Sequence, residues 1–450
     1  MNDNTNGVVV TAVRKIERKI EFNEMMFKNQ SWKYSAPILS YDDFIHNGYS
    51  ADEAEYLTLA RNVLKDATTK MRRGEFTYGE SSERERGVHV EMGYFSYEVD
   101  NELLPHWKEF AAALDQFTPA INLLPDSCES SFEIYCYQMN HDALHLVKEA
   151  LIGKPFKSLR FTNDSNFDDA NEAIDPDIIL DVVESNKDLR KLNIFTNEIG
   201  REHIERLSST VSNHPSLVQL NLYGSFGPGI GDEMLASLLT IDDLALEKLG
   251  MSSNNITSAV STLLADFLAT NPRLKELDLS ENNLNVRDAE LIFNALRSNT
   301  TLRELRIPDN NIKAFRPVLW DNISLNEAAD ANHVCFISSD CFIPNYRSNI
   351  VFSDWNSLEV KQFNRGKKIY KLLSLRNKTM SNTQYFGDID VKILPNILEA
   401  VQKNYYSSFT KYYFWVDPKV DPLSIVYEIM RKWDTAFTLY KSLGLESVEN

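Results

Sequence analysis

Cysteine is scarce in this chain of 450 residues: only four occur, and none of them forms a C-x-x-C motif. This excludes a disulfide-stapled scaffold and a zinc ribbon, and it favours a reducing compartment, cytoplasmic or nuclear. Cationic side chains are also in deficit, since 47 lysines and arginines stand against 65 acidic residues, giving a net charge of −18. A nucleic-acid binder needs a clustered cationic face, so we expect no nucleic-acid partner.

Long apolar runs and catalytic motifs are missing as well. No run of about 18 apolar residues occurs, and the first apolar run, 8–10, is too short for a signal-peptide core, so we expect no membrane association. Neither G-x-S-x-G nor H-E-x-x-H is found. His141 and His145 have a spacing that zinc can use, but no third ligand is indicated and we interpret them as a surface pair. We therefore expect no metal, no cofactor and no catalytic residue.

What the sequence does contain is a leucine repeat. Five segments follow the pattern L-x-x-L-x-L, with Ile or Met as the last residue in three of them, and they start at residues 189, 217, 246, 274 and 302, a period of 28 or 29. Asparagine follows in four of them, whereas Ser225 takes this place in the second. Weaker copies precede the five at 156–161 and 132–140, and a decayed copy is expected at Ala331, Val334 and Phe336. A fixed period of this length is the signature of a solenoid.

Between these segments, apolar residues recur with helical spacing, for example at Ala289, Ile292, Phe293 and Leu296. Each unit is thus predicted to be a short strand, a turn and a helix. One unit alone cannot bury both its strand leucines and the inner side of its helix, so the units must stack. The asparagine that recurs at the end of the pattern is expected to form hydrogen bonds with backbone groups where the chain leaves the sheet.

A period of 28 or 29 with a full helix resembles the ribonuclease-inhibitor-like class of leucine-rich repeat proteins. The resemblance covers about residues 132–340. It implies a right-handed α/β horseshoe solenoid, with a parallel sheet inside and helices outside, which binds another protein on its concave face, usually without catalysis.

The two ends of the chain do not show the repeat. We expect a mixed, mainly helical N-terminal cap at 1–130, a solenoid of about seven to eight repeats at 131–340, and a mainly helical C-terminal cap at 341–450. Helices are predicted at 51–73 and 102–117, with a mobile loop at 74–87 between them. Further helices are predicted at 358–375, 391–401 and 422–443, and an aromatic-rich segment lies at 405–415.

Alternation along each strand sends the leucines into the core and the intervening residues onto the concave face. The weak copy at 132–140 then places Ile134 on this face. The candidate binding residues are Arg160, Lys191, Asn193, Phe195, Asn221, Tyr223, Lys248, Glu276, Asp278, Glu304 and Arg306. Basic residues come early and acidic ones late, and Phe195 and Tyr223 should be neighbours on adjacent strands.

Two functions remain open on the sequence alone. The favoured hypothesis is a non-catalytic scaffold that binds an unknown partner protein on the concave face, because tyrosine flanked by charge is typical of binding hot spots. The alternative is a regulator of an enzyme, such as a GTPase-activating protein, in which Arg160 or Arg201 would act. No local motif favours either arginine for that role.

Overall fold

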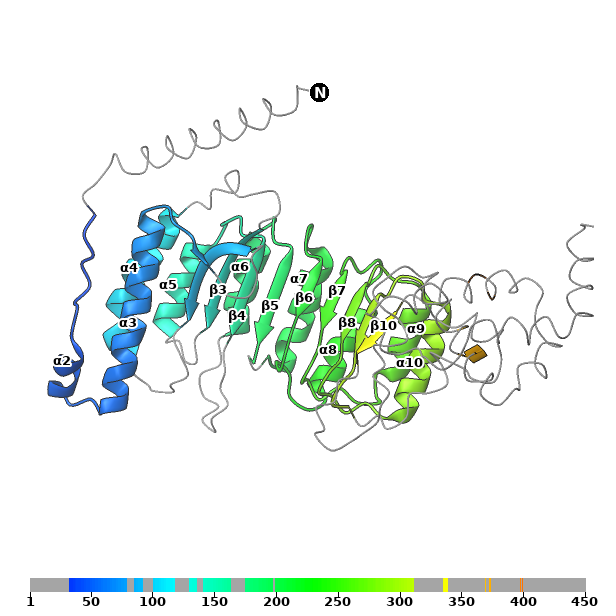
Figure 1. The fold of residues 1–450 in the computed structure, drawn as a ribbon. Helices are drawn as coiled ribbons and strands as arrows, with labels where there is room; N and C mark the ends of the chain where they lie inside the picture. Colours follow the sequence, from blue (N-terminus) through cyan, green and yellow to red (C-terminus); the bar gives the residue numbers. More distant parts are fainter. Residues whose placement is uncertain are drawn as a thin grey trace, which may run out of the picture. The chain divides into compact units, whose positions relative to one another are not determined.

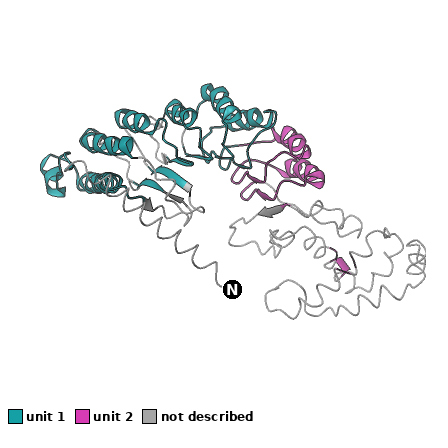
Figure 2. Cartoon of the chain, turned by 90° about the horizontal axis from the view of Figure 1, so that it is seen from above, with its two compact units in different colours: residues 1–255 teal, residues 256–450 magenta. Residues whose placement is uncertain are grey.

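The computed structural model describes residues 32–78, 85–91, 100–117, 129–135, 141–162, 175–196, 199–310 and 335–338, with the single positions 369, 372, 373, 397 and 399. The chain divides into two compact units, Met1–Asn255 and Ile256–Asn450 (Figure 2). The C-terminal helices predicted at 358–375, 391–401 and 422–443 lie outside the described residues, apart from those single positions, and so does the segment 405–415. No helix in the described ranges is long and apolar enough to cross a lipid bilayer.

The described part of unit 1 has a sheet whose strands follow one another in chain order. Its strands are β1 (Thr77–Tyr78), β2 (Glu85–Glu91), β3 (Glu129–Tyr135), β4 (Ser158–Thr162), β5 (Lys191–Phe195), β6 (Gln219–Asn221) and β7 (Lys248–Gly250). From β2 to β7 each strand pairs in parallel with the next, while β1 is antiparallel to β2. Parallel neighbours need a crossover connection, which the helices provide.

The helices of unit 1 form a layer on one side of this sheet (Figures 1 and 2). They are α2 (Tyr41–His46), α3 (Ala51–Arg72), α4 (Asp100–Gln116), α5 (His141–Leu151), α6 (Pro176–Ser185), α7 (Ile204–Asn213) and α8 (Ile230–Leu239), with the short 3-10 helix η2 (Arg201–His203) before α7. The predicted helices at 51–73 and 102–117 are confirmed within two residues. A sheet covered by helices on one side is the architecture of the α/β horseshoe solenoid that the repeat predicts.

The core lies between the sheet and the helices. Leu192, Leu220 and Leu249 are paired in register across β5–β7, and each is at most 2% exposed. Ile204, Leu207 and Val211 of α7 are buried on the facing helix side. Stacking of the repeats therefore removes both apolar surfaces from water at once, which is the main source of stability in such arrays.

The repeat asparagine bonds the backbone of the preceding repeat, as expected. The Asn254 side chain is fully buried; its Oδ1 accepts hydrogen bonds from the amides of Ser225 (2.8 Å) and Phe226 (3.0 Å), and its Nδ2 donates to the carbonyl of Leu222 (2.7 Å). Ser225, the exception in the pattern, donates from Oγ to the carbonyl of Ile194 (3.2 Å). It thus performs the donor half of the asparagine's role in the turn before.

A second polar position, three residues before each first leucine, was not predicted. Asn186 is buried and donates from Nδ2 to the carbonyl of Phe156 (2.6 Å). In the next repeat, Nδ1 of His214 accepts from the amide of Leu217 (3.1 Å), so Nε2 carries the proton and donates to the carbonyl of Asn186 (2.8 Å). Burial lowers the pKa of His214, which favours this neutral form. The sequence signal is a polar residue that recurs at this position: Asn186, His214, Asp243, Asn271 and Asn299.

Unit 2 repeats the same design over its described residues. Strands β8 (Glu276–Asp278), β9 (Glu304–Arg306) and β10 (Phe336–Ser338) pair in parallel, and the helices are α9 (Ser261–Ala269) and α10 (Val286–Ser298). Asn282 Oδ1 accepts from the amide of Ile256 (2.9 Å), and Asn310 Oδ1 accepts from the amide of Leu284 (3.0 Å). Asn310 also donates to the carbonyl of Leu279 (2.7 Å). The hydrogen bonds therefore recur from repeat to repeat.

The mobile loop predicted at 74–87 is wrong at both of its ends, where β1 and the start of β2 form a strand pair. Glycine content and the charge run suggested a loop, but β2 adds a parallel strand beside β3. Gly87 permits this close approach, because a Cβ there would lie 1.6 Å from the carbonyl oxygen of Ser131. The sheet thus extends into the region that was expected to be only a cap.

Two weak copies were aligned three residues out of register. Ile134, expected on the sheet surface, is 1% exposed and pairs with Phe161, so it belongs to the core. In the decayed copy the pattern places Val334 opposite Leu305, whereas the residue in register with Leu305 is Ile337. The physical reason is that these segments place large apolar or aromatic residues at neighbouring positions, and a shift by any odd number of residues exchanges the two faces of a strand.

We predict that Asn254→Ala lowers the free energy of unfolding by about 2 to 4 kcal/mol, because two buried amides and one carbonyl lose their partner. Chemical denaturation in urea measures the change. The matched control is Asn213→Ala, since Asn213 is exposed and bonds only Ser209 of its own helix; we expect a change below about 0.5 kcal/mol there. Equal losses for the two variants would contradict this role of Asn254.

Candidate protein-binding surface

The sheet face of unit 1 consists of the residues that alternate with the core positions. On β4–β7 and just beyond β6 these are Ser158, Arg160, Thr162, Lys191, Asn193, Phe195, Gln219, Asn221, Tyr223, Lys248 and Gly250. Their predicted columns are confirmed: Arg160 pairs with Asn193, Asn193 with Asn221, and Gln219 with Lys248. On β2 and β3 the same face continues with His89, Glu91, Glu133 and Tyr135.

Arg160 is held between two aromatic rings. Its guanidinium carbon lies 4.4 Å from the ring centre of Phe195 and 4.7 Å from that of Tyr135. The two rings come from β5 and β3, the strands on either side of β4. A planar guanidinium stacks well on aromatic faces, and this contact fixes its position while its in-plane N–H groups keep their capacity to donate.

The aromatic contacts continue across the neighbouring strands. The rings of Phe195 and Tyr223 have centres 5.9 Å apart and are tilted by 45°, which confirms that they are neighbours. On the other side, the ring of Tyr135 lies 5.4 Å from that of His89. The result is a continuous aromatic stripe, formed by His89, Tyr135, Arg160, Phe195 and Tyr223, across β2 to β6.

At one end of the aromatic stripe, the buried carboxylate of Glu133 is hydrogen-bonded to His89. Glu133 is only 4% exposed, and its Oε2 lies 3.2 Å from Nδ1 of His89. The hydrogen bond to Glu133, with a smaller contribution from Glu91, raises the pKa of His89. Glu133 is in register with Arg160, but no described carboxylate forms an ion pair with that guanidinium. The acidic partner nearest in register is therefore engaged elsewhere.

Two polar atoms beneath the aromatic stripe are buried without a hydrogen-bond partner in the described part of the chain. They are Nε of Arg160 and Oγ1 of Thr162, two residues along the same strand and on the same face. Such atoms are rare in native structures, since each costs the free energy of its lost hydration. Both residues belong to the sheet face of β4, where a polar group supplied by a partner would restore the missing hydrogen bonds.

In unit 2 the corresponding positions are mostly acidic. Glu276 pairs with Glu304 and Asp278 with Arg306 across β8 and β9. Arg306 is bonded within this group: its Nε lies 2.7 Å from a carboxylate oxygen of Glu304, and a second nitrogen lies 3.8 Å from one of Asp278. Glu304, followed by the other acidic neighbours, raises the pKa of Arg306. Arg306, the arginine among the predicted residues of this face, is thus paired with acidic residues of the same face.

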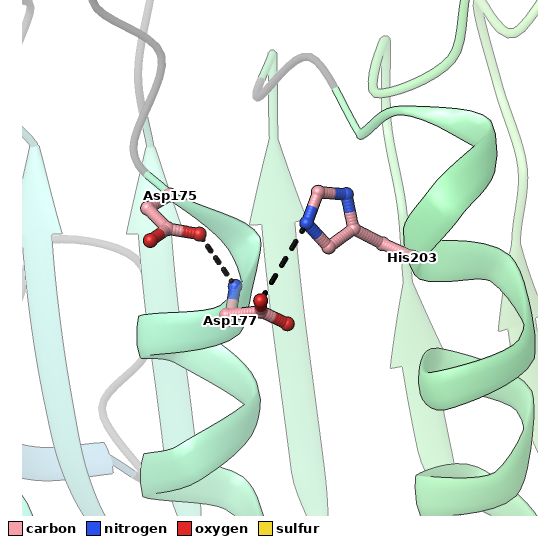
Figure 3. Close-up of side chains that lie close together, drawn as sticks. All are labelled: Asp175, Asp177 and His203. Atoms are coloured by element: carbon pink, nitrogen blue, oxygen red, sulfur yellow. Dashed lines mark hydrogen bonds and ion pairs between the residues drawn. The ribbon is translucent and has the colours of Figure 1, made fainter.

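The helix side carries a cluster of Asp175, Asp177 and His203, whose ligand atoms lie within 4.8 Å of one another (Figure 3). Asp175 caps α6 by accepting from the amide of Asp177 (3.0 Å), and His203 lies 3.9 Å from Asp177. Arg206 bonds Asp177 at 2.8 Å. A helix cap and an ion pair account for this cluster, and the adjacent guanidinium opposes a bound cation.

Arg206 also joins α6 to α7 through further acidic residues. Its guanidinium bonds Asp181 at 2.5 Å and Glu184 at 2.9 Å. These carboxylates, Glu184 first, raise the pKa of Arg206. Asp181 in turn bonds Lys148 of α5 at 2.5 Å. The charges on this side therefore tie neighbouring helices together, which distinguishes them from those of the sheet face.

His89, Glu133, Tyr135 and Thr162 belong to the sheet face and were not among the predicted site residues. The first three were missed because residues 88–91 of β2 were assigned to no element and β3 was aligned three residues out of register. A signal was available: Val88 and Val90, like Phe132 and Ile134, alternate with polar or aromatic residues in the manner of a strand with one buried side.

We predict that replacing His89 by glutamine costs stability in a pH-dependent way. Because Glu133 raises the pKa of folded His89, its contribution is full below about pH 6.5, the value of an unfolded histidine, and disappears as the pH rises through the raised value. Urea denaturation of wild type and variant from about pH 5 to about pH 8 measures this difference. His141→Gln, at an exposed histidine of α5, sets the baseline. A difference that stays constant over this range would contradict the coupling.

Comparison with known proteins agrees with the repeat. Residues 270–293, which run from the end of α9 into α10, match the family model described as Leucine Rich repeat. A search of curated proteins gave no match. Among solved structures, the leiomodin-1 actin-binding site 2 is 18% identical with a TM-score of 0.26, over 40% of this chain and 96% of that one.

An internalin from Listeria monocytogenes is 13% identical with a TM-score of 0.22, over 57% of this chain and 90% of that one. At such low scores, the fold assignment depends on the strands and helices of this chain itself. The narrower ribonuclease-inhibitor-like class stays a prediction. The matched segment and the recurring strand, asparagine and helix show that this chain contains leucine-rich repeats.

Proposed function

We propose that this protein is a non-catalytic scaffold that binds a partner protein, and that the sheet face of unit 1 is the surface it uses. The observation that supports this most strongly is the aromatic stripe with Arg160 stacked between two rings. Arginine and tyrosine are the residue types enriched at binding hot spots, where few side chains supply most of the affinity. Strands also hold these side chains more rigidly than loops do, which lowers the entropic cost of binding.

The proposal extends to the rest of the chain. The region 1–130, apart from its strands β1 and β2, and the segment 341–450 are proposed as caps that cover the ends of the repeat array, which otherwise expose apolar surface. The acidic face of unit 2 is proposed as a second contact region, and the narrow class and a cytoplasmic or nuclear location remain predictions of the sequence. No metal, cofactor or nucleic acid has a part in the proposal.

The alternative, a GTPase-activating role, would need an arginine that reaches into another protein's active site. Arg201 is 67% exposed and lies 2.6 Å from Glu233 in a surface ion pair, while Arg160 is fixed between rings. Neither contact favours that role over simple binding, and it stays a less favoured hypothesis.

Affinity purification from the native cell extract tests the proposed surface. We expect the double variant Phe195→Ala/Tyr223→Ala to recover specific partners at least about tenfold less well than wild type, because a lost hot spot costs about 2 kcal/mol. The matched control is Tyr41→Ala/Ile45→Ala, which removes two side chains of α2 that are 40% and 38% exposed.

Thermal unfolding of both double variants verifies that they are folded. Partner recovery that falls equally in the two variants, or in neither, would contradict the assignment of binding to the sheet face.

A further inference from the structure

The charged residues at the sheet-face positions of β4–β7 all carry the same sign. They are Arg160, Lys191 and Lys248, whereas the chain as a whole carries −18. Lys191 and Lys248 lie in one column, separated by Gln219. A cationic strip on an acidic protein attracts a partner of opposite charge and repels most others, so it contributes to selectivity as well as to encounter rate.

Among the residues of this strip, Arg160 has the clearest unused capacity to donate hydrogen bonds. Its Nε is buried and has no hydrogen-bond partner in the described ranges, and none of the carboxylates described there pairs with it. The hydroxyl of Thr162, on the same strand, is in the same condition. Two donors without acceptors on the same face of β4 call for a group that accepts hydrogen bonds and carries negative charge, and a carboxylate accepts both from a guanidinium and from a hydroxyl.

The rings beside Arg160 define what surrounds that group. Tyr135 and Phe195 flank the guanidinium, and Tyr223 extends the aromatic surface by one strand. An acidic residue bound at Arg160 would therefore have apolar or aromatic neighbours in contact with these rings. The partial exclusion of water by the rings strengthens the charge-assisted hydrogen bonds.

From these contacts we propose that the sheet face of unit 1 binds an acidic segment of a partner protein, with one Asp or Glu carboxylate bonded to Arg160 and Thr162. Lys191 and Lys248 attract further acidic residues of the same segment. This inference rests on the proposed function and adds to it the chemistry of the partner. The carboxylate is chosen because a single guanidinium and a hydroxyl match its two oxygens.

A phage-displayed library of random peptides, selected on the full-length chain, tests the inference. We expect the selected peptides to be enriched in Asp or Glu beside aromatic or aliphatic residues. Each selected peptide is then synthesised, together with a version in which Asp and Glu become Asn and Gln, and its binding is measured by fluorescence anisotropy. The amide versions should bind at least about tenfold more weakly, since a hydrogen-bonded charge pair is lost.

Matched variants of the chain assign this effect to one residue. Arg160→Gln should weaken binding of the acidic peptides by at least about tenfold and leave the amide versions unchanged, whereas Arg201→Gln removes the same charge from an exposed site outside the sheet face and should have no effect. Arg160→Lys keeps the charge without the planar fork and should give an intermediate loss. Thermal unfolding verifies that the variants are folded.

Several results would overturn the inference: no enriched peptide, enrichment without acidic residues, or equal affinity of the amide versions. Its failure can be told apart from failure of the proposed function. If Phe195→Ala/Tyr223→Ala lowers partner recovery but Arg160→Gln does not, the sheet face binds a partner without the carboxylate contact. If neither variant lowers it, the surface itself is wrongly assigned.

Discussion

Hydrogen bonding of a buried asparagine to the backbone of the neighbouring repeat is the interaction on which the other features of this protein depend. Asn254 satisfies two amides and one carbonyl that the turn leaves inside the protein. Without such a partner the turn could not be buried, and the leucines of successive strands could not lie in register. Leucine supplies the favourable free energy of burial, and asparagine makes that burial compatible with the polar backbone.

Register in the core also determines the opposite face of the sheet. Once Leu192 is paired with Leu220, the residues between the leucines must form columns on the other side. The side chains at these positions do not pack in the core, and in unit 1 they include arginine, lysine and aromatic residues. The function proposed for the sheet face is therefore a consequence of the same alternation that builds the fold.

The part of the fold that can be predicted from the sequence depends on how clearly the two faces of each strand differ in residue type. The segment around Leu192 allows only one assignment of its residues to the two faces of the strand, because leucine or isoleucine alternates there with polar residues and a single aromatic. The segment of Phe132, Ile134 and Tyr135 allows two such assignments, since its large residues occupy both faces. The contact between His89 and Glu133 joins residues 44 apart in the chain, and it could not be inferred while β2 was unassigned. The stacking of Arg160 between Tyr135 and Phe195 likewise depends on side-chain conformations that no spacing encodes.

Cysteine accessibility along one strand tests most directly whether alternate residues face the solvent. Single cysteines placed at Lys191, Leu192, Asn193 and Ile194 of β5 are labelled with a maleimide in the native protein, and mass spectrometry follows each site separately from the natural cysteines. The account predicts rapid labelling at Lys191 and Asn193 and strong protection at Leu192 and Ile194, which are at most 2% exposed. Similar rates at all four sites, or the inverse pattern, would contradict the alternation and with it the assigned binding face.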